Sequence, residues 1–136
     1  MTHRTRQLCF LLLIGGAIAL ALWQPVFAAK PDHVQRVKDT GSCPGCDLSS
    51  ADLAGVRASG GDLQGANLTS ASLAGADFQG ANCYTAIFRL ADLKDVKFAG
   101  ANLNNANLQG AKHADLSGAT TNERTVCPDG TRGPCR

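Results

Sequence analysis

Residues 46–65 read CDLSSADLAGVRASGGDLQG, and the same five-residue pattern continues through the next fifty residues without an insertion. Cut in fives from Cys46, this part of the chain gives fourteen consecutive units. The first residue is Ala in ten of them, and the third is Leu or Phe in eleven. Self-similarity at a fixed period is typical of stacked, solenoidal architectures, in which each repeat buries its apolar residues against its neighbours. We therefore predict a solenoid rather than a closed globular domain.

A period of five fits neither an α-helix, which repeats every 3.6 residues, nor a simple alternating strand. It fits a coil with four sides, in which each unit forms one side and turns one corner. The first and third residues of a unit are two apart, so they point to the same face of an extended segment and would face the interior. Each coil of four units would then stack about 4.8 Å above the last through backbone hydrogen bonds.

The A-(D/N)-(L/F)-X-X units resemble those of pentapeptide-repeat proteins, and the resemblance covers residues 46–113. It implies an all-β fold, a right-handed quadrilateral parallel β-helix, here of about 3.5 coils. Some members of that family resemble DNA in shape and charge and act on topoisomerases. Those members are longer, acidic and cytosolic, and this chain departs from them. The third-position residues Ala58, Cys83 and His113 also depart from the pattern. These departures affect packing and leave the predicted fold unchanged.

Stacked coils would align the third-position residues in four interior columns. Such a core is narrow and leaves no room for a substrate, which argues against an internal active site. His113 would close the second column as a structural plug. The alternative for His113 is a ligand or a catalytic base, and a base needs a cleft and a poised partner. The expected columns contain Leu48, Leu68, Phe88 and Leu108; Leu53, Leu73, Leu93 and His113; Ala58, Phe78 and Phe98; and Leu63, Cys83 and Leu103.

Residues 1–28 are predicted to be a cleaved export signal. Arg4 and Arg6 precede an apolar run over 8–23, and small residues stand before a cleavage site after Ala28. A membrane anchor is the alternative, but the run is short for a hydrocarbon layer of about 30 Å. We expect a periplasmic or secreted protein without membrane attachment after cleavage. Of 13 basic and 11 acidic residues, two basic ones leave with the signal. The balanced remainder gives no electrostatic footprint for nucleic acid.

A solenoid must protect its terminal coils from edge pairing, and the N-terminal cap is predicted at residues 29–45. A short amphipathic helix would begin at Pro31, with its acidic residue early and its basic residues late. Val34 and Val37 would face the first coil. His33 would lie on the exposed side of the helix.

At the other end, we place the β-helix at residues 46–118 and a C-terminal cap at 119–136. The regular pattern runs out at His113, and the motif restarts two residues early at Ala114. A slip of two keeps the inward alternation but cuts a corner short, so we expect the coil to end or distort here. Turn signals in the tail fit a cap.

Four of the six cysteines lie near the two ends of the repeat. In an oxidising compartment, Cys43–Cys46 and Cys127–Cys135 are the natural local pairs. Cys83 takes an inward position and is interpreted as a small buried hydrophobic residue. The C-x-x-C pair could alternatively be a redox centre, but it lacks the helix N-terminus and βαβ setting of such centres. A zinc site made of the four clustered cysteines is disfavoured by their separation.

One surface region is a candidate interaction site. Tyr84, Ile87 and Leu90 stand where neighbouring units carry Gln, Asn, Ser or Gly, and they would point outward. An exposed Tyr with aliphatic and Arg neighbours has the composition of an interface centre. The alternative is drift on a tolerant surface, where scattered apolar residues are ordinary. The candidate patch consists of Tyr84, Ile87, Arg89, Leu90, Lys94 and Lys97.

No phosphate loop, nucleophile elbow or metal-binding helix motif occurs in the sequence. We therefore predict an exported scaffold or binding module that acts through its outer surface, without catalysis, cofactor or metal. Its partner would be another protein or a second copy of the chain. The alternative is a thiol-disulfide redox protein that uses Cys43 and Cys46.

Overall fold

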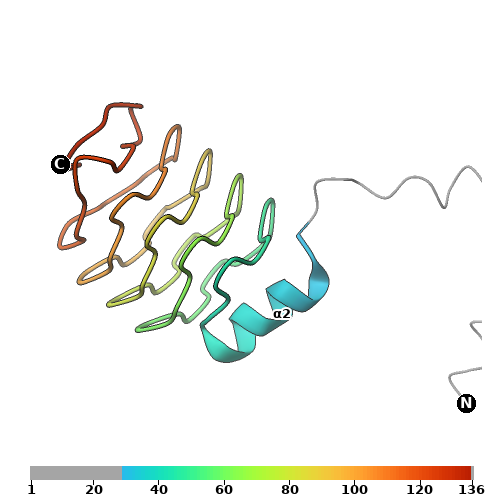
Figure 1. The fold of residues 1–136 in the computed structure, drawn as a ribbon. Helices are drawn as coiled ribbons and strands as arrows, with labels where there is room; N and C mark the ends of the chain where they lie inside the picture. Colours follow the sequence, from blue (N-terminus) through green and yellow to red (C-terminus); the bar gives the residue numbers. More distant parts are fainter. Residues whose placement is uncertain (1–28, 136) are drawn as a thin grey trace, which may run out of the picture.

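The computed structural model describes residues 29–135, and the predicted export signal, residues 1–28, lies outside the described residues. The chain winds into a stack of four-sided coils, a right-handed quadrilateral β-helix as predicted (Figure 1). Helix α2 (Pro31–Thr40) lies at the first coil, and the C-terminal tail lies at the opposite end of the stack. None of the helices in the described part is long and apolar enough to cross a membrane.

A period of twenty residues sets the register of the coils. Each regular unit makes parallel bridges through its second residue, so that Asp47 pairs with Asn67 and Asn67 with Ile87. The hydrogen bonds run from coil to coil. The N–H of Leu48 donates to the carbonyl oxygen of Asn67, and the N–H of Asn67 donates to that of Cys46, both at 2.8 Å. The regular coils are therefore held by isolated bridges rather than by long strands.

We name the four sides in the order in which the chain forms them. The first side contains residues 46–50 and the units twenty, forty and sixty positions later. The second, third and fourth sides begin in the same way at residues 51–55, 56–60 and 61–65. The unit to which a residue belongs therefore decides the side on which it lies.

The interior is filled by the first and third residues of the units. Every Leu and Phe at a third position from Leu48 to Leu108 is at most 2% exposed. The rings of Phe78 and Phe98, one coil apart, stack with centroids 5.7 Å apart, and Phe88 meets both edge-on at 6.3 and 5.8 Å. Such aromatic pairs add about 0.5–1.5 kcal/mol each beyond the burial of area. The inward orientation predicted for these residues is confirmed.

Helix α2 covers the open face of the first coil. Pro31 lies in the first turn, where its missing N–H breaks no intrahelical bond. Gly41 ends the helix in the left-handed conformation with a φ of 70°, and its N–H donates to the carbonyl oxygen of Val37 at 2.9 Å. Val37 is fully buried and Val34 packs against the core, so the predicted inner face of the cap is confirmed.

Gly61 shows how closely the cap approaches the coil. It begins its unit, whereas the other units begin with Ala, Val or Cys. A Cβ atom added at Gly61 would lie 2.0 Å from the carbonyl oxygen of Gly41. The glycine at this first position is therefore required by the cap backbone, which leaves no space for a side chain.

The prediction that His33 lies on the exposed side of α2 is wrong. Its side chain faces the coil, and Nδ1 accepts a hydrogen bond from the N–H of Asp47 at 3.0 Å. In later coils the equivalent N–H donates to the coil below, and the first coil has no coil below it. His33 supplies the missing acceptor, and Ser42 Oγ does the same for the N–H of Asp62 at 2.9 Å. The cap thus pairs backbone donors that the edge would leave unpaired.

The register changes in the last coil. Asn102 pairs with Thr120, eighteen positions on, and Asn107 with Val126, nineteen positions on. The coil distorts, as expected, but parallel pairing continues beyond residue 118, where we placed the end of the β-helix. The loss of two residues shortens one corner and keeps the inward alternation, because two is the period of an extended segment.

The prediction that His113 plugs the second column is also wrong. Its backbone adopts a φ of 56°, and its side chain is 60% exposed. The shortened corner turns the residue outward, where Nδ1 lies 3.0 Å from Oδ1 of Asp92. Farther along the chain, Leu116 and Ala119 pack against the core at this end.

A side chain replaces backbone pairing at the end of the fourth side. In the regular pattern, the N–H of Thr85 donates to the main-chain oxygen of Asn104 at 3.1 Å. One coil later, the N–H of Asn105 instead donates to the side-chain Oδ1 of Asn122 at 3.2 Å. The tail is therefore free to leave the path of the coil at Asn122 while the ladder below it stays paired.

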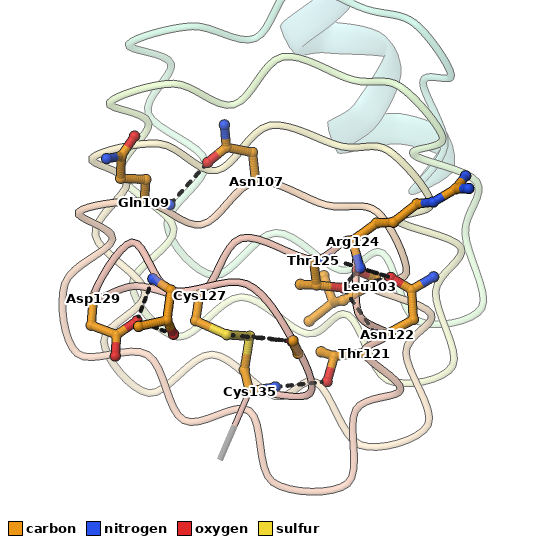
Figure 2. Close-up of a disulfide and its surroundings, with 12 residues drawn as sticks. Leu103, Asn107, Gln109, Thr121, Asn122, Arg124, Thr125, Cys127, Asp129 and Cys135 are labelled. Atoms are coloured by element: carbon orange, nitrogen blue, oxygen red, sulfur yellow. Dashed lines mark hydrogen bonds between the residues drawn. A yellow bond between two sulfur atoms is a disulfide. The ribbon is translucent and has the colours of Figure 1, made fainter.

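The same side chain organises the turn that follows. Oδ1 of Asn122 also accepts hydrogen bonds from the N–H groups of Arg124 and Thr125, both at 3.1 Å. Thr125 is fully buried, and its hydroxyl donates to the carbonyl oxygen of Leu103 at 3.1 Å (Figure 2). Asn122 and Thr125 together fix the last turn onto the coil beneath it.

Candidate functional site

The six residues of the predicted patch are distributed around one coil. The second residues of their units belong to different bridge ladders, and units two apart lie on opposite sides. A single flat partner surface therefore cannot contact all six. Ile87, Arg89 and Leu90 share the first side, whereas Tyr84, Lys94 and Lys97 lie on the fourth, second and third sides.

Leu90 is the most unusual residue of the first side. It is 55% exposed and has a φ of 57°, a left-handed conformation that is unfavourable for Leu by about 1–2 kcal/mol. Its Cδ2 atom would lie 2.7 Å from a Cβ atom at Gly110, so the glycine makes room for it. Backbone strain and solvent exposure coincide at this apolar side chain, and such outliers motivate a functional hypothesis.

Tyr84 is oriented toward the C-terminal end of the stack. It is 37% exposed, and its hydroxyl oxygen accepts a hydrogen bond from Nδ2 of Asn105 at 2.9 Å. Oδ1 of Asn105 in turn accepts from Nδ2 of Asn122 at 2.9 Å. These bonds tie Tyr84 to the irregular last coil rather than to Ile87 on the first side.

A hollow of about 560 Å³ lies where the fourth side meets the tail. Tyr84 and Asn104 line it from the coils, and Arg124 and Pro134 line it from the tail. Oδ1 of Asn104 is buried and has no hydrogen-bond partner among the described residues. Buried polar atoms are rarely left unpaired, so this oxygen calls for an explanation.

This hollow was not predicted from the sequence. It depends on the side chain of Asn122 taking the place of a backbone acceptor, which the five-residue pattern does not encode. One signal was present in the sequence, because the restarted motif loses its apolar third residue at Thr121, and Asn122 follows directly. Asn and Thr in such a place commonly bond to nearby backbone groups.

Both predicted disulfides are present, Cys43–Cys46 and Cys127–Cys135. Cys43 is fully buried and Cys46 is 3% exposed. Thiol-disulfide exchange requires a thiolate to reach one of the sulfur atoms, and the burial of both cysteines opposes this. The first pair is therefore disfavoured as a redox centre. In the second pair, Cys135 is half-buried, and its N–H donates to Oγ1 of Thr121 at 3.0 Å (Figure 2).

Cys83 is a free cysteine and fully buried. Burial, with a smaller contribution from the negative charge of Asp62, raises the pKa of its thiol to about 12. The thiolate is the reactive form of cysteine, and the folded chain suppresses it near neutral pH. Cys83 is therefore a packing residue, in the third-position slot in which we placed it.

Other shifted pKa values belong to carboxyl groups in turns. The pKa of Asp92 is lowered, first by the hydrogen bond with His113 and then by the N–H of Lys94. The pKa values of Asp115 and Asp129 are lowered by hydroxyl and N–H groups two residues on. Within residues 29–135, no group of three or more His, Cys, Asp or Glu side chains is placed to hold a metal ion. These carboxylates cap turns and form no cluster.

The regular part of the chain matches a known protein family. A sequence model described as pentapeptide repeats, in eight copies, matches residues 46–82 and 86–120. The chain belongs to the pentapeptide-repeat family. The gap between the two matches falls on residues 83–85, where Cys83 and Tyr84 depart from the pattern. The second match runs beyond His113 to residue 120, in agreement with the pairing of Thr120 in the last coil.

Solved structures of other pentapeptide-repeat proteins are similar to this chain. HetL, involved in heterocyst differentiation regulation in the cyanobacterium Nostoc, is 29% identical over 67% of this chain and 53% of its own, with a TM-score of 0.43. A protein of the Arabidopsis thaliana thylakoid lumen is 29% identical over 70% and 74%, with a TM-score of 0.36. Another Nostoc protein is 30% identical over 74% and 80%, with a TM-score of 0.31.

The chain thus spans about half the length of the HetL structure. No curated protein sequence matches it. The repeat itself establishes the family.

Proposed function

We propose that this protein is an exported binding module that acts through the outer surface of its β-helix and has no catalytic role. The observation that carries the proposal is Leu90, an exposed apolar residue held in a left-handed conformation. Stability alone would favour Gly, Asn or Asp at this corner. The interior offers no alternative binding site, because its columns are filled by buried side chains.

The first side supplies the binding surface. Ile87 lies half-buried in its ladder, and Arg89 is exposed beside Leu90. An apolar centre with an Arg neighbour is the composition enriched in protein interfaces. The partner is a protein, either a second copy of the chain or a different one.

Export is supported by the cysteines. Disulfides persist in oxidising compartments and are rare in the cytosol, and this small domain carries two of them. Cell fractionation followed by N-terminal sequencing tests this part of the proposal. The expected result is a periplasmic or secreted protein that begins at Ala29, and a full-length cytosolic protein would contradict it.

Leu90→Asn tests the binding surface. Asn tolerates the left-handed conformation, so thermal stability is expected to stay equal or to rise. Self-association of residues 29–136, measured by sedimentation velocity, or photo-crosslinking from position 89 to a partner in the native compartment, is expected to fall at least tenfold. Asp95→Asn is the matched control, because Asp95 occupies the corresponding corner on the second side with a φ of 57°.

Two results would overturn the assignment. The first is a chain that stays monomeric at all concentrations and gives no crosslinked product from position 89. The second is association that Leu90→Asn and Asp95→Asn reduce equally.

A further inference from the structure

We propose that the hollow at the end of the fourth side binds a neutral saccharide. This site is separate from the surface around Leu90 and does not depend on it. The hollow, of about 560 Å³, falls within the range of roughly 300–1,000 Å³ that is typical of small-molecule sites. It forms where the tail leaves the path of the coils, so its walls come from two regions of the chain.

The walls are held by hydrogen bonds before any ligand arrives. Asn105 lies between Tyr84 and Asn122 and bonds to both side chains at 2.9 Å. Asn122 is fixed in turn by the N–H groups of Arg124 and Thr125. A site whose side chains are already fixed loses less conformational entropy on binding. The tail is also closed by the Cys127–Cys135 disulfide.

The charges of the site favour an uncharged ligand. Glu123 and Arg124 both line the hollow and carry opposite charges, and the remaining polar groups are amides and one phenol. A phosphate or carboxylate ligand would meet Glu123, and a cation would meet Arg124. Neither kind of ion is favoured by the site as a whole.

The chemistry of the lining matches sugar hydroxyls. Each hydroxyl of a sugar is a donor and an acceptor, and an amide offers both functions on one rigid plane. The Tyr84 hydroxyl accepts its hydrogen bond from Asn105, so its own proton remains available to a ligand. The aromatic ring has a negative face that suits the weakly positive C–H groups of a pyranose. Tyr84 is therefore the expected stacking residue.

Asn104 supplies the observation that points to a ligand donor. Its Oδ1 is a buried acceptor without a hydrogen-bond partner in residues 29–135, yet the residue lines the hollow. The terminal torsion of an Asn side chain is soft, so the amide can turn this oxygen toward an incoming hydroxyl. Binding would then satisfy an acceptor that the free protein leaves unpaired.

The experiment uses residues 29–136 with both disulfides formed, and titrates ¹⁵N-labelled protein with cellotriose, maltotriose and tri-N-acetylchitotriose. At least one of the three is expected to shift the amide signals of Asn104, Asn105 and Arg124 at concentrations below 10 mM. Tyr84→Ala and Asn104→Ala are each expected to weaken that binding at least tenfold. Gln79→Ala is the matched control, because Gln79 is an exposed amide at the same position of a unit on the third side.

A thermal melt separates a binding role for Asn104 from a structural one. Asn104→Ala is expected to keep or raise the melting temperature, because its side-chain oxygen makes no bond that the fold needs. The proposal is overturned if none of the three saccharides shifts these signals up to 10 mM. It is equally overturned if Tyr84→Ala and Asn104→Ala bind as the wild type does, or if the shifts lie on another side of the coil.

Discussion

The regular coils and the last coil are built by different means. Between residues 46 and 113, a period of twenty pairs nearly every unit with the unit above it in the next coil, and the interior columns are filled mostly by Leu and Phe. Beyond Ala114 the offset falls to eighteen and then nineteen. There, the side chains of Asn122 and the buried Thr125 hydrogen-bond to the coil below, and a disulfide closes the tail.

This difference shows that a surface hollow forms in this solenoid where the regular repeat is interrupted. A strict repeat places the same shape on every coil and turns its apolar groups inward. The irregular coil frees the tail from the path of the stack, and the hollow lined by Tyr84 and Arg124 results. We expect the regular coils to carry most of the folding free energy and the last coil to open first, since local openings concentrate where few apolar contacts are buried.

The largest effect is expected from Phe88→Ala in the middle of the regular coils. Phe88 is fully buried and its ring meets both Phe78 and Phe98. Loss of a buried Phe leaves a cavity and lowers the free energy of unfolding by about 3–5 kcal/mol. Urea denaturation followed by circular dichroism measures the change, and Arg89→Ala, next to it and exposed, is the control with no expected effect. A loss below about 1 kcal/mol would contradict the view that the columns dominate stability.

Removal of the C-terminal disulfide, by Cys127→Ala with Cys135→Ala, is expected to act on the last coil alone. Opening a short loop of this kind costs about 2–3 kcal/mol in the chain-entropy account. Hydrogen exchange should speed up at the N–H of Leu108, which donates to Val126 in the last coil. The N–H of Asn67, in the regular coils, should keep its protection. Equal acceleration at both amides would show that the two regions unfold as one unit.

Cys83 gives a probe of the regular coils that responds to pH. The pKa of its thiol is raised from 9.0 to about 12 in the folded chain, so above pH 9 the unfolded chain loses a proton that the folded chain keeps. The folded state then binds more protons, and stability falls as pH rises from about 9 to 12, by about 1.4 kcal/mol per pH unit.

Urea denaturation at pH 8, 9 and 10 measures this slope, and Cys83→Ala should lack it. A thiol assay on residues 29–136 should detect one thiol per chain, and only after denaturant is added. A thiol that reacts readily in the native protein would mean that the regular coils are less closed than their burial indicates.

The fold could be predicted because the repeat encodes its own register. Once Leu48 and Leu68 are assigned to one column, the period of twenty places the other columns, and the structure confirms that their Leu and Phe residues face inward. Both disulfides could be predicted from the short spacing of their cysteines. In each case, short-range spacing in the sequence is enough to determine the contact.

The ends could not be predicted in the same way, because their contacts depend on which backbone groups the repeat leaves unpaired. His33 faces the coil since the first coil lacks a neighbour below, and a helical pattern alone does not reveal that need. The candidate site depends on Asn122 and on a two-residue slip, neither of which follows the period. The predicted surface patch spread over four sides, because residues close in sequence turn corners every five positions.

The smallest effect is expected from His113→Ala, at the boundary between the two regions. His113 and Asp92 are both well exposed, at 60% and 44%, so solvent and salt screen their interaction. We therefore expect no measurable change in the melting temperature at neutral pH and moderate salt. Leu116→Ala is the contrasting variant. Leu116 packs against the core, so its replacement should lower the melting temperature clearly. If His113→Ala lowers it as much as Leu116→Ala does, the histidine supports the end of the stack after all. The shortened corner would then belong to the regular coils rather than mark their end.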